Sequence, residues 1–358
     1  MAFESELWEA TRPSFLVRYV PDQNGRVASP VYAFAPKPDI DVARAKLARI
    51  TRGAPEVVVK VTGRQKGSSH VEAHLTYIGR AGDVEIETRD GEILTSKEDI
   101  LERAEEWSDT LYWRERSTVS SVSMILSMPE GTDPEAVLGA VRAVAHIELS
   151  DNHDYVMALH TDTPRPHVHL TVQAEGLDRH RFNPRPADLH RLRERFAQEL
   201  RERGVEAEAT PRRARGRGVA GSSMALVKMR VRLQSEGSRQ MPTSDMRSND
   251  QAVAVARGEL ELPAFVAKGK ERWQDIRSYY AKAADALDAT GDADDRKLAS
   301  DVRGFLQERP DFHSTPEVFA QRHATLILAK EKERDDTAPR SLDKSPPERP
   351  PPGKGRSR

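Results

Sequence analysis

The chain has 358 residues, of which 32% are charged, and its formal net charge at pH 7 is only -1. This length allows one large domain or two ordinary ones, and the balanced charge does not by itself indicate a nucleic-acid partner. The absence of cysteine excludes disulfides, thiolate zinc sites and a cysteine nucleophile. No apolar run approaches the roughly 20 residues of a membrane span, and the acidic start is unlike a signal peptide, so we expect a cytoplasmic protein without membrane insertion.

The two ends of the chain differ in composition from its middle. Residues 1–53 contain the breaker segments PDQNG and APKPD, which predict a partly disordered N-terminal extension. A compact domain is expected over residues 54–220. Only helical patterns follow over residues 221–335, and residues 336–358 are a proline-rich, basic tail that we expect to be disordered.

The compact domain begins with a strand and a short helix. Residues 56–63, EVVVKVTG, are β-branched and predict the strand. The segment SSHVEAHLTYIGR then offers a serine cap at Ser68 or Ser69, and a glycine, Gly79 or Gly82, ends it. We therefore expect a short helix between these caps.

The rest of the domain alternates helices with strands. A serine-capped helix is predicted over 96–113, a strand enters a turn from residue 119, and Pro134 opens the next helix. Residues 154–174 form two strands joined by a six-residue loop, and a basic amphipathic helix follows and ends at Gly204. This order predicts an α/β protein of the α+β sandwich type, with a largely antiparallel central sheet flanked by helices.

Three histidines gather in the segment HTDTPRPHVHLTVQ, residues 160–173. Because strand side chains alternate faces, His167 and His169 share one face, and the short loop brings His160 back beside His167. Three neutral imidazoles with open coordination positions suit a divalent metal that also holds a substrate oxygen. The alternative is that they are ordinary polar residues on a half-exposed sheet.

The pattern H-x-D-x4-H-x-H on paired strands resembles the histidine motif of the HUH endonucleases, specifically the relaxase and mobilization nuclease family. The segment AHLTYIGRAG is similar to the tyrosine segment of the T-DNA border-nicking endonuclease type, with Tyr77 at the matching position, and Ser127 matches the family's substrate-positioning serine motif. The resemblance covers roughly residues 56–217. One departure is Ser123, where such relatives often carry a histidine, so the role of this strand stays open.

The resemblance implies a HUH relaxase-like fold and a DNA relaxase, a site- and strand-specific endonuclease that acts by transesterification. Tyr77 would nick one strand at the transfer origin of a plasmid or integrative element and form a 5′-phosphotyrosyl intermediate that starts conjugation. Mg²⁺ or Mn²⁺ would be held by His160, His167 and His169. Partners would be single-stranded DNA at the origin, an accessory relaxosome protein and a type IV secretion coupling protein.

Asp162 has two candidate roles in this chemistry. It can orient a metal-bound histidine through that ring's second nitrogen, or it can take the proton of the tyrosine. A base or a nearby cation is needed because a phenol, with an ordinary pKa of about 10, is a poor nucleophile at neutral pH. We favour the orienting role.

Tyr77 has an alternative role as a core residue, because Leu75 and Ile78 flank it on a short helix. If the segment is helical, however, His70, His74 and Tyr77 lie on one face at positions i, i+4 and i+7. The tyrosine would then belong to a polar stripe, which favours a functional role.

Two further functions remain open at this stage. Tyr279 and Tyr280 lie after the histidines, as the tyrosine does in rolling-circle replication initiators of the same superfamily. At most one of the pair could face a site, since adjacent helical residues point about 100° apart. The third candidate is a non-catalytic DNA-binding relative.

Arginines follow the histidine strands in the segment PRRARGRG, without acidic partners among them. Such a cluster favours contacts with DNA phosphates. The segment TGRQKGSS is expected to add two basic residues near the entrance of the site. The predicted DNA-binding residues are Arg64, Lys66, Arg212, Arg213, Arg215 and Arg217.

Overall fold

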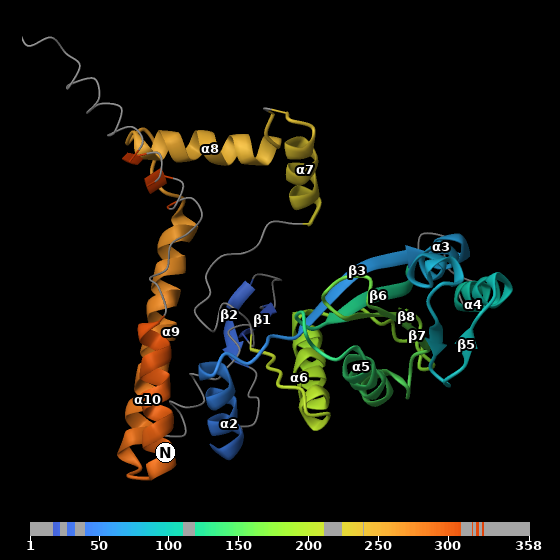
Figure 1. Cartoon of the computed structure of the whole chain (residues 1–358), viewed down its shortest axis with the longest axis horizontal. Helices are drawn as coiled ribbons and strands as arrows, with labels where there is room; N and C mark the ends of the chain where they lie inside the picture. The colour runs from blue at the N-terminus through green and yellow to red at the C-terminus, as the bar shows by residue number, and fades with distance from the viewer. Residues whose placement is uncertain are drawn as a thin grey trace, which may run out of the picture. The chain divides into compact units, whose positions relative to one another are not determined.

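The computed structural model describes residues 17–21, 27–32, 40–109, 119–210, 224–238, 240–308, 317, 320–321 and 324–325 (Figure 1). The chain divides into two compact units. One consists of Met1–Gly218 with Glu271–Phe312, and the other of Val219–Lys270 with His313–Arg358. Among the described residues, no helix is both long enough and apolar enough to cross a membrane.

A six-stranded sheet organises the first unit, in the order β3-β6-β8-β7-β4-β5, and every neighbouring pair is antiparallel. The predicted α+β class with an antiparallel sheet is therefore confirmed. The strands are β3 (Val58–Lys66), β4 (Ile86–Thr88), β5 (Ile93–Leu94), β6 (Val119–Ser127), β7 (Tyr155–His160) and β8 (His167–Gln173). A separate antiparallel pair is formed by β1 (Val17–Pro21) and β2 (Val27–Tyr32).

One face of the six-stranded sheet carries the main core. Helices α5 (Pro134–Leu149) and α6 (Pro186–Glu202) pack on it (Figure 1). The alternate apolar residues of the strands, such as Leu170, meet Val141 of α5 and Phe196 of α6 in one buried cluster. This arrangement places the opposite side chains of β8, which include His167 and His169, on the other face.

The other face of the sheet is covered by α3 (Ser68–Ile78) and α4 (Lys97–Asp109). Ile78 of α3, Trp107 of α4 and Ala158 of β7 lie in the same buried cluster. This second core holds α3 against the strands that carry the histidines.

Helix ends in this unit follow local sequence signals in most cases. Asp133 accepts a hydrogen bond from the Glu135 N–H at the start of α5, and Gly204, with a positive φ of 78°, follows α6 as expected. The predicted serine cap of α3 is wrong. Gly67 occupies that position with φ 75°, and its N–H donates to the Ser120 hydroxyl at 2.9 Å.

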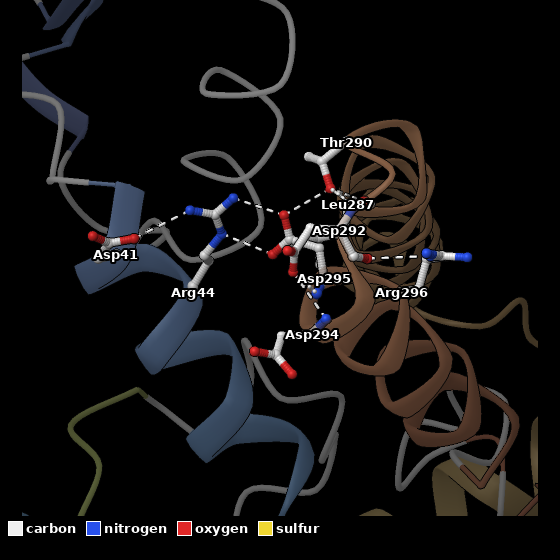
Figure 2. Close-up of polar contacts among 8 residues, drawn as sticks. All are labelled: Asp41, Arg44, Leu287, Thr290, Asp292, Asp294, Asp295 and Arg296. Carbon is white, nitrogen blue, oxygen red and sulfur yellow. Dashed lines mark hydrogen bonds and ion pairs between the residues drawn. The ribbon is translucent and has the colours of Figure 1, made fainter.

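Helix α2 (Ile40–Thr51) forms a third core in the same unit with α9 (Ala264–Ala289) and α10 (Ala293–Gln307). At its rim, the Arg44 guanidinium donates to both carboxylate oxygens of the buried Asp295, at 2.8 and 2.7 Å (Figure 2). The hydroxyl of Thr290 donates to the same carboxylate at 2.8 Å. These contacts join a helix near the start of the chain to a helical pair more than 200 residues later.

Helix α2 also contacts the α6 side of the six-stranded sheet through ion pairs. Lys46 lies 3.1 Å from Glu194 of α6, and Arg49 lies 2.9 Å from the buried Glu208. The domain boundaries at residues 54 and 220 remain a prediction. The compact unit that holds the sheet nevertheless includes α2 before residue 54 and α10 after residue 220.

The second unit contains α7 (Met224–Ser235) and α8 (Thr243–Ala256), which confirms the helical character of the C-terminal region. Arg230 of α7 pairs with Asp245 of α8 at 2.7 Å. The predicted tail at 336–358 lies outside the described residues.

Candidate metal centre and nuclease site

The three predicted metal ligands converge at one end of β7 and β8. His160 pairs directly with His167 across the two antiparallel strands, and His169 follows two residues later on the same face. The ring centroids of His160 and His169 lie 4.4 Å apart, and one ring nitrogen of each of the three residues lies within 4.8 Å of the others. The arrangement can hold a metal ion with three nitrogen ligands.

Burial favours the neutral form of two of these imidazoles, His160 and His169. His169 is 5% exposed, and its burial, followed by repulsion from His160 and His167, lowers its pKa to about 3. Burial is also the main cause that lowers the pKa of His160, with contributions from Arg80 and His167. A neutral imidazole has the lone pair that a metal ligand needs, so the site is ready to bind a cation at neutral pH.

The second ring nitrogens of two histidines are held by backbone carbonyls. Nε2 of His160 lies 2.6 Å from the Ile78 carbonyl oxygen, and Nδ1 of His167 lies 3.1 Å from that of Arg165. Nδ1 of His169 is buried without a hydrogen-bond partner. Since an unsatisfied buried polar atom is costly, a metal ion in contact with this ring fits the site.

Tyr77 stands on α3 beside these rings. Its side chain is 58% exposed, and its ring lies edge-on to His169 with 6.3 Å between centroids. Three residues earlier on the helix, Nε2 of His74 lies 3.0 Å from the Thr171 hydroxyl on β8, which ties α3 to the histidine strand. His70 is exposed. The core alternative for Tyr77 does not agree with this exposure, whereas its neighbours Leu75 and Ile78 are fully buried.

Asp162 contacts an arginine that the sequence analysis did not single out. One amino nitrogen of Arg80 lies 2.5 Å from the Asp162 carboxylate and 3.3 Å from Nδ1 of His160. The guanidinium carbon lies 5.3 Å from the centroid of the Tyr77 ring. Among the described contacts, backbone carbonyls rather than Asp162 meet the second nitrogens of His160 and His167, and Asp162 reaches the histidines through Arg80.

Sequence reasoning could not find Arg80, because its place depends on an unusual backbone turn. Arg80 and Ala81 have positive φ values of 51° and 57° at the end of α3, in a region that only glycine adopts freely. The signal in the sequence is the pair of glycines around them, Gly79 and Gly82, which by itself predicts only the end of a helix.

Ser127 lies opposite His167 in the pairing of β6 with β8, so both occupy one row on the site face. Its hydroxyl donates to its neighbour's carbonyl, that of Met128, at 3.3 Å. Ser123 lies further along the same strand, opposite Thr171, and its hydroxyl accepts from Gln65 Nε2 at 3.2 Å. At the position where relatives often have a histidine, this chain thus has a buried hydroxyl within a polar network of the sheet.

The basic residues predicted at the entrance lie away from the histidines. Arg64 pairs with Val122, whose side chain belongs to the α5–α6 face, and Lys66 pairs with Val119, eight residues along β6 from Ser127. At about 3.4 Å per residue, Lys66 is about 27 Å from the Ser127 row. Lys60 is better placed, because it is exposed and pairs with Ile125, which pairs with His169. The cluster of Arg212, Arg213, Arg215 and Arg217 lies outside the described residues.

The rival tyrosines lie on α9, and Tyr280 belongs to the core that this helix forms with α2 and α10. Tyr280 is 1% exposed and packs on Phe305, with 5.5 Å between ring centroids. Tyr279 is 37% exposed on the same helix. The described contacts of Tyr280 join it to α2 and α10 and not to the three histidines.

An antiparallel sheet that presents three converging imidazoles beside an exposed tyrosine is the arrangement of the HUH endonuclease class. Comparison with protein families agrees, because residues 77–205 match the model of the relaxase nuclease domain described as MobA/VirD2-like. The chain therefore carries a relaxase nuclease domain of this family over these residues, which include Tyr77 and the three histidines. No curated protein matches the chain.

Proposed function

We propose that this protein is a DNA relaxase that nicks one strand at the transfer origin of a plasmid or integrative element, with Tyr77 as the nucleophile. The observation that carries the proposal is the position of Tyr77, which is exposed beside His169 inside a relaxase nuclease domain. The described ring contacts of this phenol are with His169 and Arg80 at the site and not with the buried core. The phenol is accessible to a phosphodiester bound over the histidines.

The reaction is a transesterification at phosphorus. The Tyr77 phenol oxygen forms a bond to the phosphorus, and the bond from phosphorus to the 3′ oxygen breaks. The proton that the phenol loses is balanced by the proton that the released 3′-hydroxyl gains. The product is a 5′-phosphotyrosyl strand with a free 3′-hydroxyl, and no nucleotide hydrolysis is needed because the phosphodiester energy is kept.

The three histidines would hold a divalent ion, which when bound supplies positive charge to a non-bridging phosphate oxygen. Of the two predicted metals, the donor set favours Mn²⁺. Imidazole nitrogen suits transition metals, whereas Mg²⁺ prefers oxygen ligands. The carbonyls of Ile78 and Arg165 would fix the ring orientations of His160 and His167.

Ser127, in the row of His167, is the candidate for positioning the substrate. The substrate would be single-stranded DNA at the origin. Lys60 on the site face and the four arginines from Arg212 to Arg217 are the candidate phosphate contacts, and Arg64 and Lys66 could act only on DNA that extends along the sheet. An accessory relaxosome protein and a type IV secretion coupling protein are the expected partners in conjugation.

A replication initiator that uses Tyr279 or Tyr280 is the second candidate. The burial of Tyr280 against Phe305 speaks against it, since a nucleophile must reach DNA. The non-catalytic alternative leaves the exposure of Tyr77 and the unpartnered nitrogen of His169 without an explanation. Both observations support the relaxase.

A nicking assay tests the proposal. Supercoiled plasmid that carries the DNA adjacent to this gene would be incubated with the protein and Mn²⁺, or with EDTA. We expect relaxed circles only with metal, and loss of nicking in His167→Ala with residual DNA binding, because the arginine contacts persist. His180→Ala is the matched control, since that imidazole is 88% exposed and pairs with Asp178. Equal loss of binding and nicking in His167→Ala would indicate a structural role for the histidine.

A further inference from the structure

Arg80 lies between three groups of the site. Its amino nitrogen is 2.5 Å from the Asp162 carboxylate and 3.3 Å from Nδ1 of His160, and its guanidinium is 5.3 Å from the Tyr77 ring centroid. Two consecutive residues in the left-handed region, Arg80 and Ala81, turn the chain back toward the site after α3. Such a turn costs about 1–2 kcal/mol per residue and is kept where the fold holds a side chain in a required place.

The proton positions on His160 follow from its partners. The Ile78 carbonyl oxygen, 2.6 Å from Nε2, can only accept, so Nε2 carries the hydrogen. In the neutral ring Nδ1 therefore has the lone pair, and Arg80 donates to it. This lone pair is also the one through which His160 can bind a metal in this orientation.

Arg80 and a metal ion cannot share that lone pair. A metal bound to an imidazole nitrogen lies about 2.0–2.1 Å from it. It would then come within bonding distance of the Arg80 amino group, which is only 3.3 Å from the same nitrogen. Contact at that range and repulsion between two cations both exclude joint occupancy.

We propose that Arg80 occupies the metal-binding nitrogen of His160 in the metal-free protein and is displaced by the metal toward Tyr77. This inference rests on the proposed function, because it takes the histidines as the metal site. Asp162 keeps the displaced guanidinium in place, so binding of the metal brings a fixed positive charge to the nucleophile. Arg80 is thus a positioning residue, and Asp162 acts by tethering it.

The experiment is a titration of the full chain with Mn²⁺, followed by calorimetry, in parallel with covalent attachment to a single-stranded oligonucleotide that spans the nick site. The main variant is Arg80→Met, which keeps the apolar stem beside the Tyr77 ring but removes the charge and the donors. Its Mn²⁺ affinity should rise about threefold or more, which corresponds to the loss of one competing hydrogen bond. Its rate of attachment should fall.

Two further variants distinguish competition from a structural effect. Arg80→Lys restores a cation and a donor, so its Mn²⁺ affinity and its attachment rate should both return toward those of the wild type. Arg52→Ala is the control, because Arg52 forms an exposed pair with Glu206 away from the histidines. It should change neither quantity. A variant that merely destabilised the site would bind Mn²⁺ more weakly.

Each outcome decides the inference. Equal or weaker Mn²⁺ affinity in Arg80→Met would overturn the competition, and an unchanged attachment rate would overturn the role of the displaced charge. If the wild type bound no Mn²⁺, or bound it equally well after His169→Ala, the metal site would fall and the inference with it. Loss of the metal site would contradict the proposed function as well. The two outcomes for Arg80→Met would contradict only the inference about Arg80 and leave the proposed function intact.

Discussion

The buried His169 makes the stability of the metal-free protein depend on pH in a way that can be calculated. Its pKa is about 3 in the folded protein and about 6.5 in an unfolded chain. Above pH 6.5 the residue is neutral in both states and has no effect. As the pH falls below 6.5 the unfolded chain takes up a proton that the folded protein refuses, so stability is lost between pH 6.5 and about 3.

The size of the loss follows from the two pKa values. It is about 2 kcal/mol at pH 5 and about 3 kcal/mol at pH 4. Urea unfolding in EDTA, followed by tryptophan fluorescence, would measure it, because Trp107 of α4 is buried in the core that α4 shares with α3. The comparison is with His169→Asn, which removes the titrating group and should flatten the profile by these amounts.

The control for this experiment is His70→Asn, since His70 is an exposed histidine on α3. Its pH profile should remain parallel to that of the wild type. Parallel profiles for the wild type and His169→Asn between pH 7 and pH 4 would contradict a lowered pKa of His169 in the folded protein. They would show that His169 takes up a proton as easily in the folded protein as in the unfolded chain.

Further substitutions test separate parts of the structure. Tyr77→Phe should change the free energy of unfolding by no more than about 0.5 kcal/mol, because the ring is exposed. The variant should nevertheless form no covalent DNA adduct, and a larger loss of stability would indicate a packing role for the tyrosine. Arg44→Met should cost about 3 kcal/mol in urea unfolding, because the buried Asp295 carboxylate loses both of its guanidinium donors. A cost below about 1 kcal/mol would contradict the importance of this pair. Thr171→Val should destabilise the fold by about 1–2 kcal/mol and slow adduct formation, because His74 loses the Thr171 hydroxyl as its hydrogen-bond partner. An unchanged rate of adduct formation would show that this contact does not position α3.

The antiparallel sheet and its histidines were predictable because they depend on local periodicity. Alternation along residues 167–172 and a short loop are enough to place His167 and His169 on one face with His160 beside them, and the structure has this pairing. The helical position of Tyr77 was predictable for the same reason. Local spacing determines which side chains share a face, and the three histidines lie within one short segment of the chain, residues 160–169.

Features that depend on distant contacts or on very short elements were not predictable. Strands β4 and β5 have only three and two residues, too few for a periodic signal, although Asp90-Gly91 between them is a hairpin signal. Helix α2 lies in the segment predicted as an extension. It could not be predicted from its own segment, because its apolar face is buried by α9 and α10, which come from the other end of the chain. The positions of Arg64 and Lys66 depend on the register of β3 with β6, which includes two bulges.

The most direct test of the account is the identity of the residue that becomes attached to DNA. The full chain would be incubated with Mn²⁺ and a single-stranded oligonucleotide that spans the nick site, digested with protease, and the DNA-linked peptide identified by mass spectrometry. We expect the phosphotyrosyl peptide to contain Tyr77, with the cleaved strand joined through its 5′ phosphate. A linked peptide that contains Tyr279 or Tyr280 would contradict the relaxase and support a replication initiator, and cleavage without any linked peptide would contradict tyrosine chemistry altogether.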